Sequence, residues 1–222
     1  GDETAKWGFE CPIAWWFWLA LVGQAGGEVI EGSEVTLGGR AGVEALALWQ
    51  RLVHEERVMK PPPGRDYNAW EATNNGFFPR YLEDNASFAV GAAPLPKQQR
   101  FAVPTGGTFF VMPKAITGAE RDAGMRFLRW MMAPEQANEW ATKTGYMPVN
   151  LDGRAQLEGF FAERPNFRVS LSQLEHALPM PWSADLFRVQ REVVQPRLEE
   201  AVLTGRDAGA VLAEAVEAAR EP

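Results

Sequence analysis

The sequence predicts an α/β fold in which helices greatly outnumber strands. The chain of 222 residues is long enough to bury a substantial core, and its 46% hydrophobic and 23% charged residues are typical of a globular protein. Nearly every segment beyond residue 118 has helical periodicity. Strand patterns are short and occur near Lys6, Val29, Phe88 and Phe110, so we expect one small mixed sheet from these four segments.

The first part of the chain is expected to hold one short strand, a Trp-rich helix, a hairpin and a second helix. Their predicted ranges are 5–10 for the strand, 13–25 for the first helix, 28–30 and 35–37 for the hairpin, and 42–58 for the second helix. Eleven consecutive apolar residues, 12–22, begin one position before the Trp-rich helix and continue into it. A bilayer span needs about 20, so we interpret this helix as buried.

The later part of the chain is expected to be helical after two further strands. The strands are predicted at 87–91 and 108–112. The helices are predicted at 119–133, 134–144, 153–163, 170–176, 185–203 and 207–220. Pro134 stands at a favourable first helical position. Gly205 ends one helix, and Asp207 is suited to cap the beginning of the next.

Charge and composition exclude several function classes. A net charge of −7 and a pI near 5.0 argue against nucleic-acid binding, which needs a concentrated basic surface. Cys11 has no partner for a disulfide. His54 and His176 are far apart and lack ligand-spaced neighbours, so no metal site is expected, and His54 is expected to be solvated. No cofactor motif is present.

Aromatic residues supply the strongest indications of a binding site. The chain has nine Trp, a residue that often stacks on flat apolar ligands or sugars. Tyr146 follows Gly145 on a turn, and Pro148 prevents this turn from continuing as a helix. Two structural alternatives stay open here, because Tyr146 can pack at an ordinary helix end and the Trp residues can belong to the core.

Several segments, in this order, resemble the family-1 extracellular solute-binding proteins of bacterial ABC importers. They lie at 15–16, 23–27, 45–49, 88–91, 94–96, 106–108, 127–130, 134–135, 144–148 and 203–206. The nearest likeness is to binders of glycerol-3-phosphate and glycerophosphodiesters, followed by sugar binders. The resemblance implies a type II periplasmic-binding-protein fold.

The sequence departs from this family in one lobe. Family members have two lobes, and only six residues here precede Trp7, where most of the first lobe would stand. Family members usually also have a stretch of chain that crosses back into the first lobe, and this stretch is missing here. We therefore expect residues 1–222 to form a single domain that corresponds to the C-terminal lobe, with a shortened crossover at about 65–87.

The resemblance also implies a set of ligand-binding residues. An aromatic ring of Trp15 or Trp16 would stack on the ligand. Neighbouring helix positions point about 100° apart, so only one of the two can face the ligand, and the resemblance favours Trp16. Backbone amides near Gly106 and Gly107 would bind oxygen atoms of the ligand. Tyr146 would cover the ligand. Arg188 and Arg191 lie near the phosphate position, although Glu192 is closest to it. The candidate residues are Trp15, Trp16, Gly106, Gly107, Thr108, Tyr146, Arg188 and Arg191.

The predicted function is non-catalytic solute binding outside the cytoplasmic membrane. The solute would be glycerol-3-phosphate-like or a carbohydrate, the partner an ABC permease, and no cofactor is implied. An exposed cleft could also lead to self-association. One alternative is a folded fragment without ligand binding. Another is a carbohydrate-active enzyme, which would need paired carboxylates such as Glu10, Glu28 or Asp185.

Overall fold

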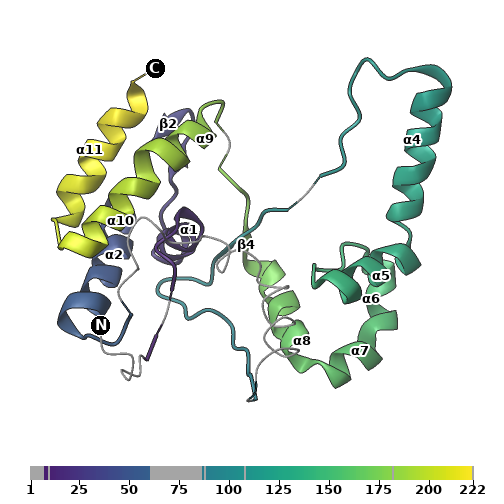
Figure 1. The fold of residues 1–222 in the computed structure, drawn as a ribbon, viewed down its shortest axis with the longest axis horizontal. Helices are drawn as coiled ribbons and strands as arrows, with labels where there is room; N and C mark the ends of the chain where they lie inside the picture. The colour runs from purple at the N-terminus through teal and green to yellow at the C-terminus, as the bar shows by residue number, and fades with distance from the viewer. Residues whose placement is uncertain are drawn as a thin grey trace. The chain divides into compact units, whose positions relative to one another are not determined.

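The chain folds into two compact units (Figure 1). The computed structural model describes residues 8–9, 11–60, 87, 89–107, 109–181 and 183–221. Unit 1 contains the described residues within 1–73, 95–105 and 176–222, and unit 2 those within 74–94 and 106–175. The assignment of residues 1–222 to a single domain stays a prediction.

Unit 1 is built from four longer helices, short helical turns and two pairs of very short strands. In chain order these are α1 (Trp15–Gln24), β1 (Ile30–Glu31), β2 (Glu34–Val35), α2 (Gly39–Gln50), the π-helical turn η1 (Arg51–Glu55), β3 (Val103–Pro104), β4 (Ala177–Leu178), α9 (Leu186–Arg188), the π-helical turn η5 (Val189–Val194), α10 (Gln195–Thr204) and α11 (Ala208–Arg220). Asp207 caps α11, because its carboxylate accepts a hydrogen bond from Ala210 N. Gly205 ends α10 in the left-handed conformation, as predicted.

The helix predicted at 42–58 begins earlier and ends earlier than expected. It begins at Gly39, continues as η1 and ends at Glu55. Arg57 then takes a positive φ of 53°. The backbone turns back there, and Val58 N and Met59 N both donate to Leu52 O. A left-handed residue cannot continue a right-handed helix, so the conformation of Arg57 sets the helix end.

Unit 2 is helical throughout its regular structure. Its elements are α4 (Gly118–Met131), α5 (Pro134–Thr144), α6 (Leu151–Arg154), the 3₁₀ turn η3 (Ala155–Leu157), α7 (Glu158–Glu163) and α8 (Pro165–Ser172), and the 3₁₀ turn η4 (Gln173–His176) follows at the boundary with unit 1. The range predicted for α5 is confirmed, with Pro134 in its first turn and Gly145 ending it at φ 82°. None of the described helices in either unit has the length and apolar content to cross a membrane.

The strands form two separate pairs instead of one sheet. β1 and β2 are antiparallel, with Ile30 opposite Val35. β3 and β4 are parallel, with Val103 opposite Ala177. The helix-rich α/β class with small sheets is confirmed, but the described residues form no single sheet that joins the predicted segments.

The four predicted sheet segments have different outcomes. Val29 directly precedes β1, whereas Lys6 and Phe88 lie outside the described residues. Phe110 is not in a strand, because no described segment pairs with residues 109–112. A strand exists only through its hydrogen-bonded partner, and sequence pattern does not supply one. Phe9 forms an isolated parallel bridge with Met59.

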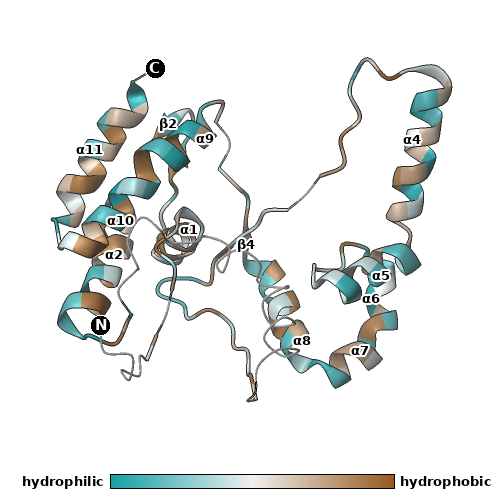
Figure 2. Ribbon diagram, viewed as in Figure 1, coloured by the Kyte–Doolittle hydropathy of each residue, from teal (hydrophilic) through white to brown (hydrophobic). Residues whose placement is uncertain are grey.

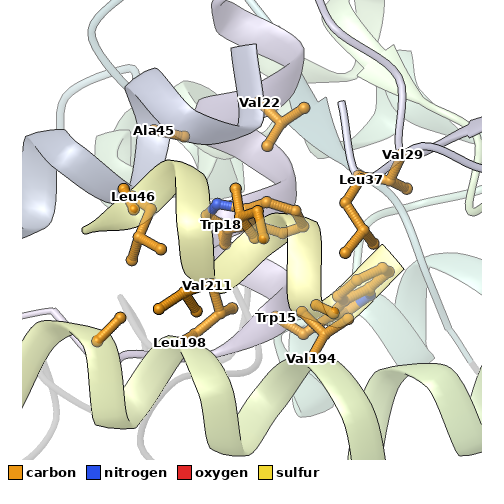
Figure 3. Close-up of a cluster of buried hydrophobic side chains, with 14 of the residues drawn as sticks. Trp15, Trp18, Val22, Val29, Leu37, Ala45, Leu46, Val194, Leu198 and Val211 are labelled. Atoms are coloured by element: carbon orange, nitrogen blue, oxygen red, sulfur yellow. The ribbon is translucent and has the colours of Figure 1, made fainter. Parts of the chain in front are cut away.

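The main core of unit 1 surrounds α1 (Figure 3). Trp18 lies in the middle of this cluster, fully buried, with Leu46 of α2, Leu198 of α10 and Val211 of α11. Trp15 packs 5.7 Å from Trp18 between ring centroids. Burial of so many large apolar side chains is the main favourable term in folding. Unit 1 therefore has a core of its own.

A side chain from a distant helix completes the beginning of α1. The first N–H groups of a helix have no partner inside it, and α1 has no side-chain cap of its own. Gln195 of α10 fills this role. Its Oε1 accepts a hydrogen bond from Trp15 N at 2.8 Å, and its Nε2 donates to Ile13 O at 2.6 Å. The orientation of α1 is thus coupled to α10.

The last carbonyl groups of α10 are also bound from another element. Gln50 Nε2 donates to Ala201 O at 2.8 Å, and His54 Nε2 lies 2.6 Å from Val202 O. The prediction that His54 is solvated is confirmed, because the residue is exposed. A helix end also needs hydrogen-bond partners for its carbonyls, and His54 of η1 lies beside one.

Unit 2 has a much smaller apolar core. Its buried cluster consists of Leu157, Phe161 and Phe167, with Phe160 and Leu171 packed against it. α4 has no buried residue, although apolar and polar residues alternate along it (Figure 2). An amphipathic helix is normally stabilised by packing its apolar side, so α4 is unusual in this respect.

Candidate functional site

The two neighbouring Trp residues of α1 have different environments. Trp15 is 2% exposed and belongs to the core, whereas Trp16 is partly exposed. The difference follows from the helix, because successive side chains point about 100° apart. Trp15 Nε1 is buried and has no hydrogen-bond partner among the described residues. Of the two rings, Trp16 is the one that a solute can reach in this structure.

The paired glycines follow β3, and both are exposed. A Cβ on Gly107 would have no described atom within 4 Å, and its φ is not in the left-handed region. Neither packing nor backbone conformation therefore requires glycine at this position. A backbone free of side chains allows close approach of a ligand to the amides. Thr108 lies outside the described residues.

Tyr146 is held at the end of α5 in unit 2. Gly145 directs the chain out of the helix, and Thr144 Oγ1 accepts a hydrogen bond from Tyr146 N at 3.3 Å. The side chain of Tyr146 is partly buried. The turn that the sequence indicated is therefore present, and Tyr146 extends from it with part of its surface accessible.

Arg188 has a structural role. Its guanidinium donates to Ala218 O at 3.5 Å and to Ala219 O at 3.0 Å. These carbonyls end α11, where unpaired acceptors and the helix dipole both favour a cation. The Arg188 guanidinium is engaged within the fold, which leaves less of it for a ligand.

Arg191 has a different environment, shared with Phe187. Its guanidinium lies 5.9 Å from the centroid of the Phe187 ring, and both residues are exposed. The side chain of Arg191 forms no hydrogen bond to another described residue. Sequence reasoning missed Phe187 as a candidate. The signal was present, because an aromatic residue and an Arg four positions later lie on one face of a helix.

The candidate residues fall in both units. Trp15, Trp16, Arg188 and Arg191 belong to unit 1, whereas Gly106, Gly107 and Tyr146 belong to unit 2. Arg188 lies at the end of α9, and Arg191 lies in η5, which follows directly.

An open hollow of about 730 Å³ lies along α11 and contains none of these residues. Its lining is acidic, with Glu214, Glu217 and Glu221, together with Arg197. Carboxylates repel an anionic solute. Arg206 already forms an ion pair with Glu214. We therefore do not assign the solute site to this hollow.

Two of the three carboxylates considered for an enzyme lie in the part of the chain that the structure describes. Glu28 and Asp185 are exposed, and Glu10 lies outside the described residues. A glycosidase needs one carboxyl group with a raised pKa next to a second carboxylate. No group of three or more His, Cys, Asp and Glu among the described residues could hold a metal ion.

Two carboxylates have shifted pKa values, and both shifts are downward. A hydrogen bond from Arg40 lowers the pKa of Glu44, and a hydrogen bond from Lys143 lowers the pKa of Glu139. Each pair has i, i+4 spacing on a helix. A lowered pKa keeps the group ionised, which is the opposite of what a general acid requires.

Residues 4–168 match the family described as bacterial extracellular solute-binding protein. This match covers most of the chain. The chain belongs to this family. The family consists, by its description, of solute-binding proteins, and this agrees with the family that the sequence segments resemble.

Two curated relatives are sn-glycerol-3-phosphate-binding periplasmic proteins, both called UgpB. The protein of Yersinia pseudotuberculosis serotype I is 34% identical over 86 residues, which is 36% of this chain and 19% of that protein. The protein of Pectobacterium atrosepticum is 25% identical over 137 residues, which is 56% of this chain and 30% of that protein. The aligned part of this chain spans less than a third of either relative.

Solved structures show the same fold. The cyclic alpha-maltosyl-1,6-maltose binding protein of Arthrobacter globiformis has a TM-score of 0.78 at 24% identity, covering 98% of this chain and 60% of that chain. UgpB of Mycobacterium tuberculosis, in complex with glycerophosphocholine, has a TM-score of 0.76 at 19% identity, covering 99% of this chain and 58% of that chain. Nearly all of this chain thus matches about three fifths of each of these two proteins.

Proposed function

We propose that this chain forms part of the extracytoplasmic solute receptor of an ABC importer. The observation that carries the proposal is the family match over residues 4–168. The receptor binds without catalysis and delivers its solute to a membrane permease. The curated relatives bind sn-glycerol-3-phosphate by name, and two similar structures are of binders of a maltose derivative and of glycerophosphocholine. The proposed solute is therefore glycerol-3-phosphate-like or a carbohydrate.

The chemistry of unit 1 favours a ligand with a phosphate group. Of the two candidate arginines, Arg191 forms no side-chain hydrogen bond to another described residue, whereas Arg188 caps α11. A guanidinium binds phosphate oxygens with two parallel hydrogen bonds. Phe187 holds the Arg191 guanidinium near its ring. Trp16 adds an aromatic face to which a glycerol or sugar backbone can pack.

In unit 2 the proposed contacts are neutral. Tyr146 offers a ring and a hydroxyl group, and Gly106 and Gly107 offer backbone amides without a side chain in the way. Amides bind an anion or a hydroxyl oxygen equally, so unit 2 fits either ligand class. Of the residues proposed here, Arg191 of unit 1 is the one that would favour a phosphate over a sugar.

Calorimetric titration of the purified chain with glycerol-3-phosphate, glycerophosphocholine and maltose tests this proposal. We expect Trp16→Ala and Tyr146→Ala to weaken binding of the preferred solute at least tenfold, which corresponds to about 1.4 kcal/mol. Trp140→Ala serves as the control, because Trp140 is an exposed Trp outside the proposed contacts. Arg191→Ala is expected to weaken the two phosphate ligands and to leave maltose unchanged.

Three results would contradict the proposal. Equal heats for the unsubstituted chain and for both aromatic variants would remove Trp16 and Tyr146 from the site. Absence of heat for all three solutes would favour the alternative of a folded fragment that does not bind solute. Hydrolysis of maltose in the same samples would instead point to the carbohydrate-active alternative.

A further inference from the structure

The helix α1 is apolar on every side. Residues 15–22 are all apolar, and only Gly23 and Gln24 follow before the helix ends. The hydrophobic effect has no direction, so it drives such a helix into the core without choosing which side faces inward. A rotation by one position, about 100°, would exchange one aromatic ring for the next at the core. The sequence of α1 alone therefore does not decide which Trp is exposed.

The observed rotation of α1 has a cost. It buries Trp15 and leaves Trp16 partly exposed. The buried Trp15 Nε1 has no hydrogen-bond partner among the described residues. A buried donor without a partner costs about 1–3 kcal/mol. Turning the Trp15 ring toward water would remove this cost, so other contacts of α1 must favour the rotation that the structure shows.

Gln195 of α10 binds the backbone at the beginning of α1 through both sides of its amide group. Its Oε1 accepts from Trp15 N at 2.8 Å, and its Nε2 donates to Ile13 O at 2.6 Å. These two backbone groups lie on either side of Ala14, the N-cap residue. Rotation of α1 by about 100° would move a Cα atom by about 3.5 Å, because Cα atoms lie about 2.3 Å from the helix axis. Neither hydrogen bond would survive this displacement.

Two further directional contacts of α1 lie farther along the helix. Arg100 Nε donates to Gly23 O at 2.8 Å, at the end of α1 that is distant from Trp16. Trp18 Nε1 donates to a carbonyl of α2 at 3.3 Å, which is longer than a typical N–H···O hydrogen bond. Gln195 instead holds the backbone of the residue directly before Trp16, with two shorter bonds. The contacts of Gln195 therefore bear most directly on the direction of the Trp16 ring.

Glu199 orients the amide group of Gln195. Gln195 Nε2 also donates to Glu199 Oε1 at 2.6 Å, one turn along α10. An ionised carboxylate and a backbone carbonyl accept hydrogen bonds only, so both require the nitrogen side of the amide. The oxygen side is thereby directed to Trp15 N. This position needs a donor and an acceptor on one side chain, and a Gln side chain supplies both.

We propose that Gln195 is a positioning residue that sets the rotation of α1 and thereby selects Trp16 as the ring presented to the solute. The step that concerns the solute rests on the proposed function, whereas the step that concerns the rotation of α1 does not. Gln195 acts through Trp16 and makes no contact with the solute. Solute affinity thus depends on a side chain of α10, a helix that holds none of the candidate binding residues.

NMR of the chain without solute tests the rotation of α1. The indole N–H signals of Trp15 and Trp16 are identified by their loss in Trp15→Phe and Trp16→Phe. Gln195→Met keeps an unbranched side chain but removes both hydrogen bonds to the start of α1. We expect it to shift the Trp16 signal and to speed exchange of the buried Trp15 indole N–H with water about fivefold. Gln50→Ala is the matched control, because Gln50 also makes two hydrogen bonds to distant carbonyls but none to α1.

Gln195→Glu separates positioning from a general loss of stability. At pH 8 its carboxylate can accept from Trp15 N, but it cannot donate to Ile13 O, and Glu199 repels it. At pH 4.5 the introduced group is protonated, because the neighbouring Glu199 raises its pKa above about 4.3, and a donor is restored.

Solute affinity of Gln195→Glu is therefore expected to fall about fivefold at pH 8, relative to the unsubstituted chain at the same pH, and to recover at pH 4.5. Calorimetric titration with maltose and glycerophosphocholine measures it. Glycerol-3-phosphate is not used here, because its phosphate group titrates near pH 6. The Trp16 indole signal of Gln195→Glu should follow the same pH change without solute.

Three outcomes would overturn the proposal. The first is that Gln195→Met leaves both indole signals unchanged. The second is that Gln50→Ala changes them as much as Gln195→Met does. The third is that Gln195→Glu behaves equally at both pH values, relative to the unsubstituted chain. If the unsubstituted chain binds no solute, the proposed function fails, and the indole signals alone decide whether Gln195 sets the rotation of α1.

Discussion

α1 and α4 are both helices with several aromatic residues, yet their environments are opposite. α1 buries Trp15 and Trp18 in a core shared with α2, α10 and α11. α4 leaves Phe127 and Trp130 about half exposed and buries none of its residues. Aromatic content alone therefore does not determine burial. What differs is the number of elements that the chain places around each helix.

The comparison also separates structural aromatic residues from those available for binding. The large buried side chains in the centre of unit 1 have a packing role, whereas Trp16 of α1 remains partly exposed and Phe17, also partly exposed, packs against the core. In unit 2 the exposed rings form a contiguous surface without a cover. Substitutions at matched positions in the two regions should therefore have very different consequences for stability.

The largest effect is expected for Trp18→Ala in the core of unit 1. Removal of a fully buried Trp leaves a cavity and should lower the free energy of unfolding by about 3–5 kcal/mol. Denaturant unfolding followed by circular dichroism measures this loss. Trp130→Ala is the matched control on α4, and a loss as large as that of Trp18→Ala would show that α4 is packed after all.

Gly42→Ala tests how tightly α2 packs on α1. A Cβ at this position would lie 2.0 Å from Leu37 O and 3.1 Å from Trp18 Cζ2. Backbone cannot move aside as a side chain can, so we expect a loss of about 1–3 kcal/mol from overpacking. Thermal unfolding measures it. An unchanged melting temperature would mean that the contact between α1 and α2 is loose.

Gly124→Ala on α4 is the counterpart and should have the opposite sign. Its Cβ would meet only the end of the flexible Met112 side chain. Alanine in place of a helical glycine should stabilise α4 by about 0.5–1 kcal/mol. Slower hydrogen exchange of α4 amides would show this gain. Faster exchange would indicate that Met112 is held firmly against the helix.

The smallest effect is expected for Phe127→Ala in the chain alone. The ring contacts Phe110 and Trp130 but is about half exposed, and alanine is the better helix former. We expect a change in unfolding free energy within about 0.5 kcal/mol. Unfolding in denaturant provides the measurement. A loss above 2 kcal/mol would remove the contrast between the two helices.

Local signals in the sequence predicted most helices and their ends well. Pro134, Gly145, Gly205 and Asp207 act at helix ends as their chemistry requires. These residues work through contacts within a few positions of the chain, so sequence alone is sufficient to interpret them. The order of such segments also predicted the family correctly.

The strands and the roles of single side chains were harder to predict. Residues 109–112 have strand-forming side chains, but the described part of the chain offers them no partner. The exposed His54 also contacts Val202 O, and Arg188, a predicted ligand residue, also donates to a carbonyl at the end of α11. In each case the partner lies far away in the sequence, and no local pattern identifies it.

The sequence by itself determined the family, the helix-rich α/β class and the beginnings and ends of most helices. These properties depend on local periodicity, capping and turn residues. Only the tertiary structure decided that Trp15 is core, that Arg191 and Phe187 share an exposed face, and that α4 lacks a cover. Burial and exposure depend on which distant elements meet, because apolar side chains leave water only where another surface replaces it.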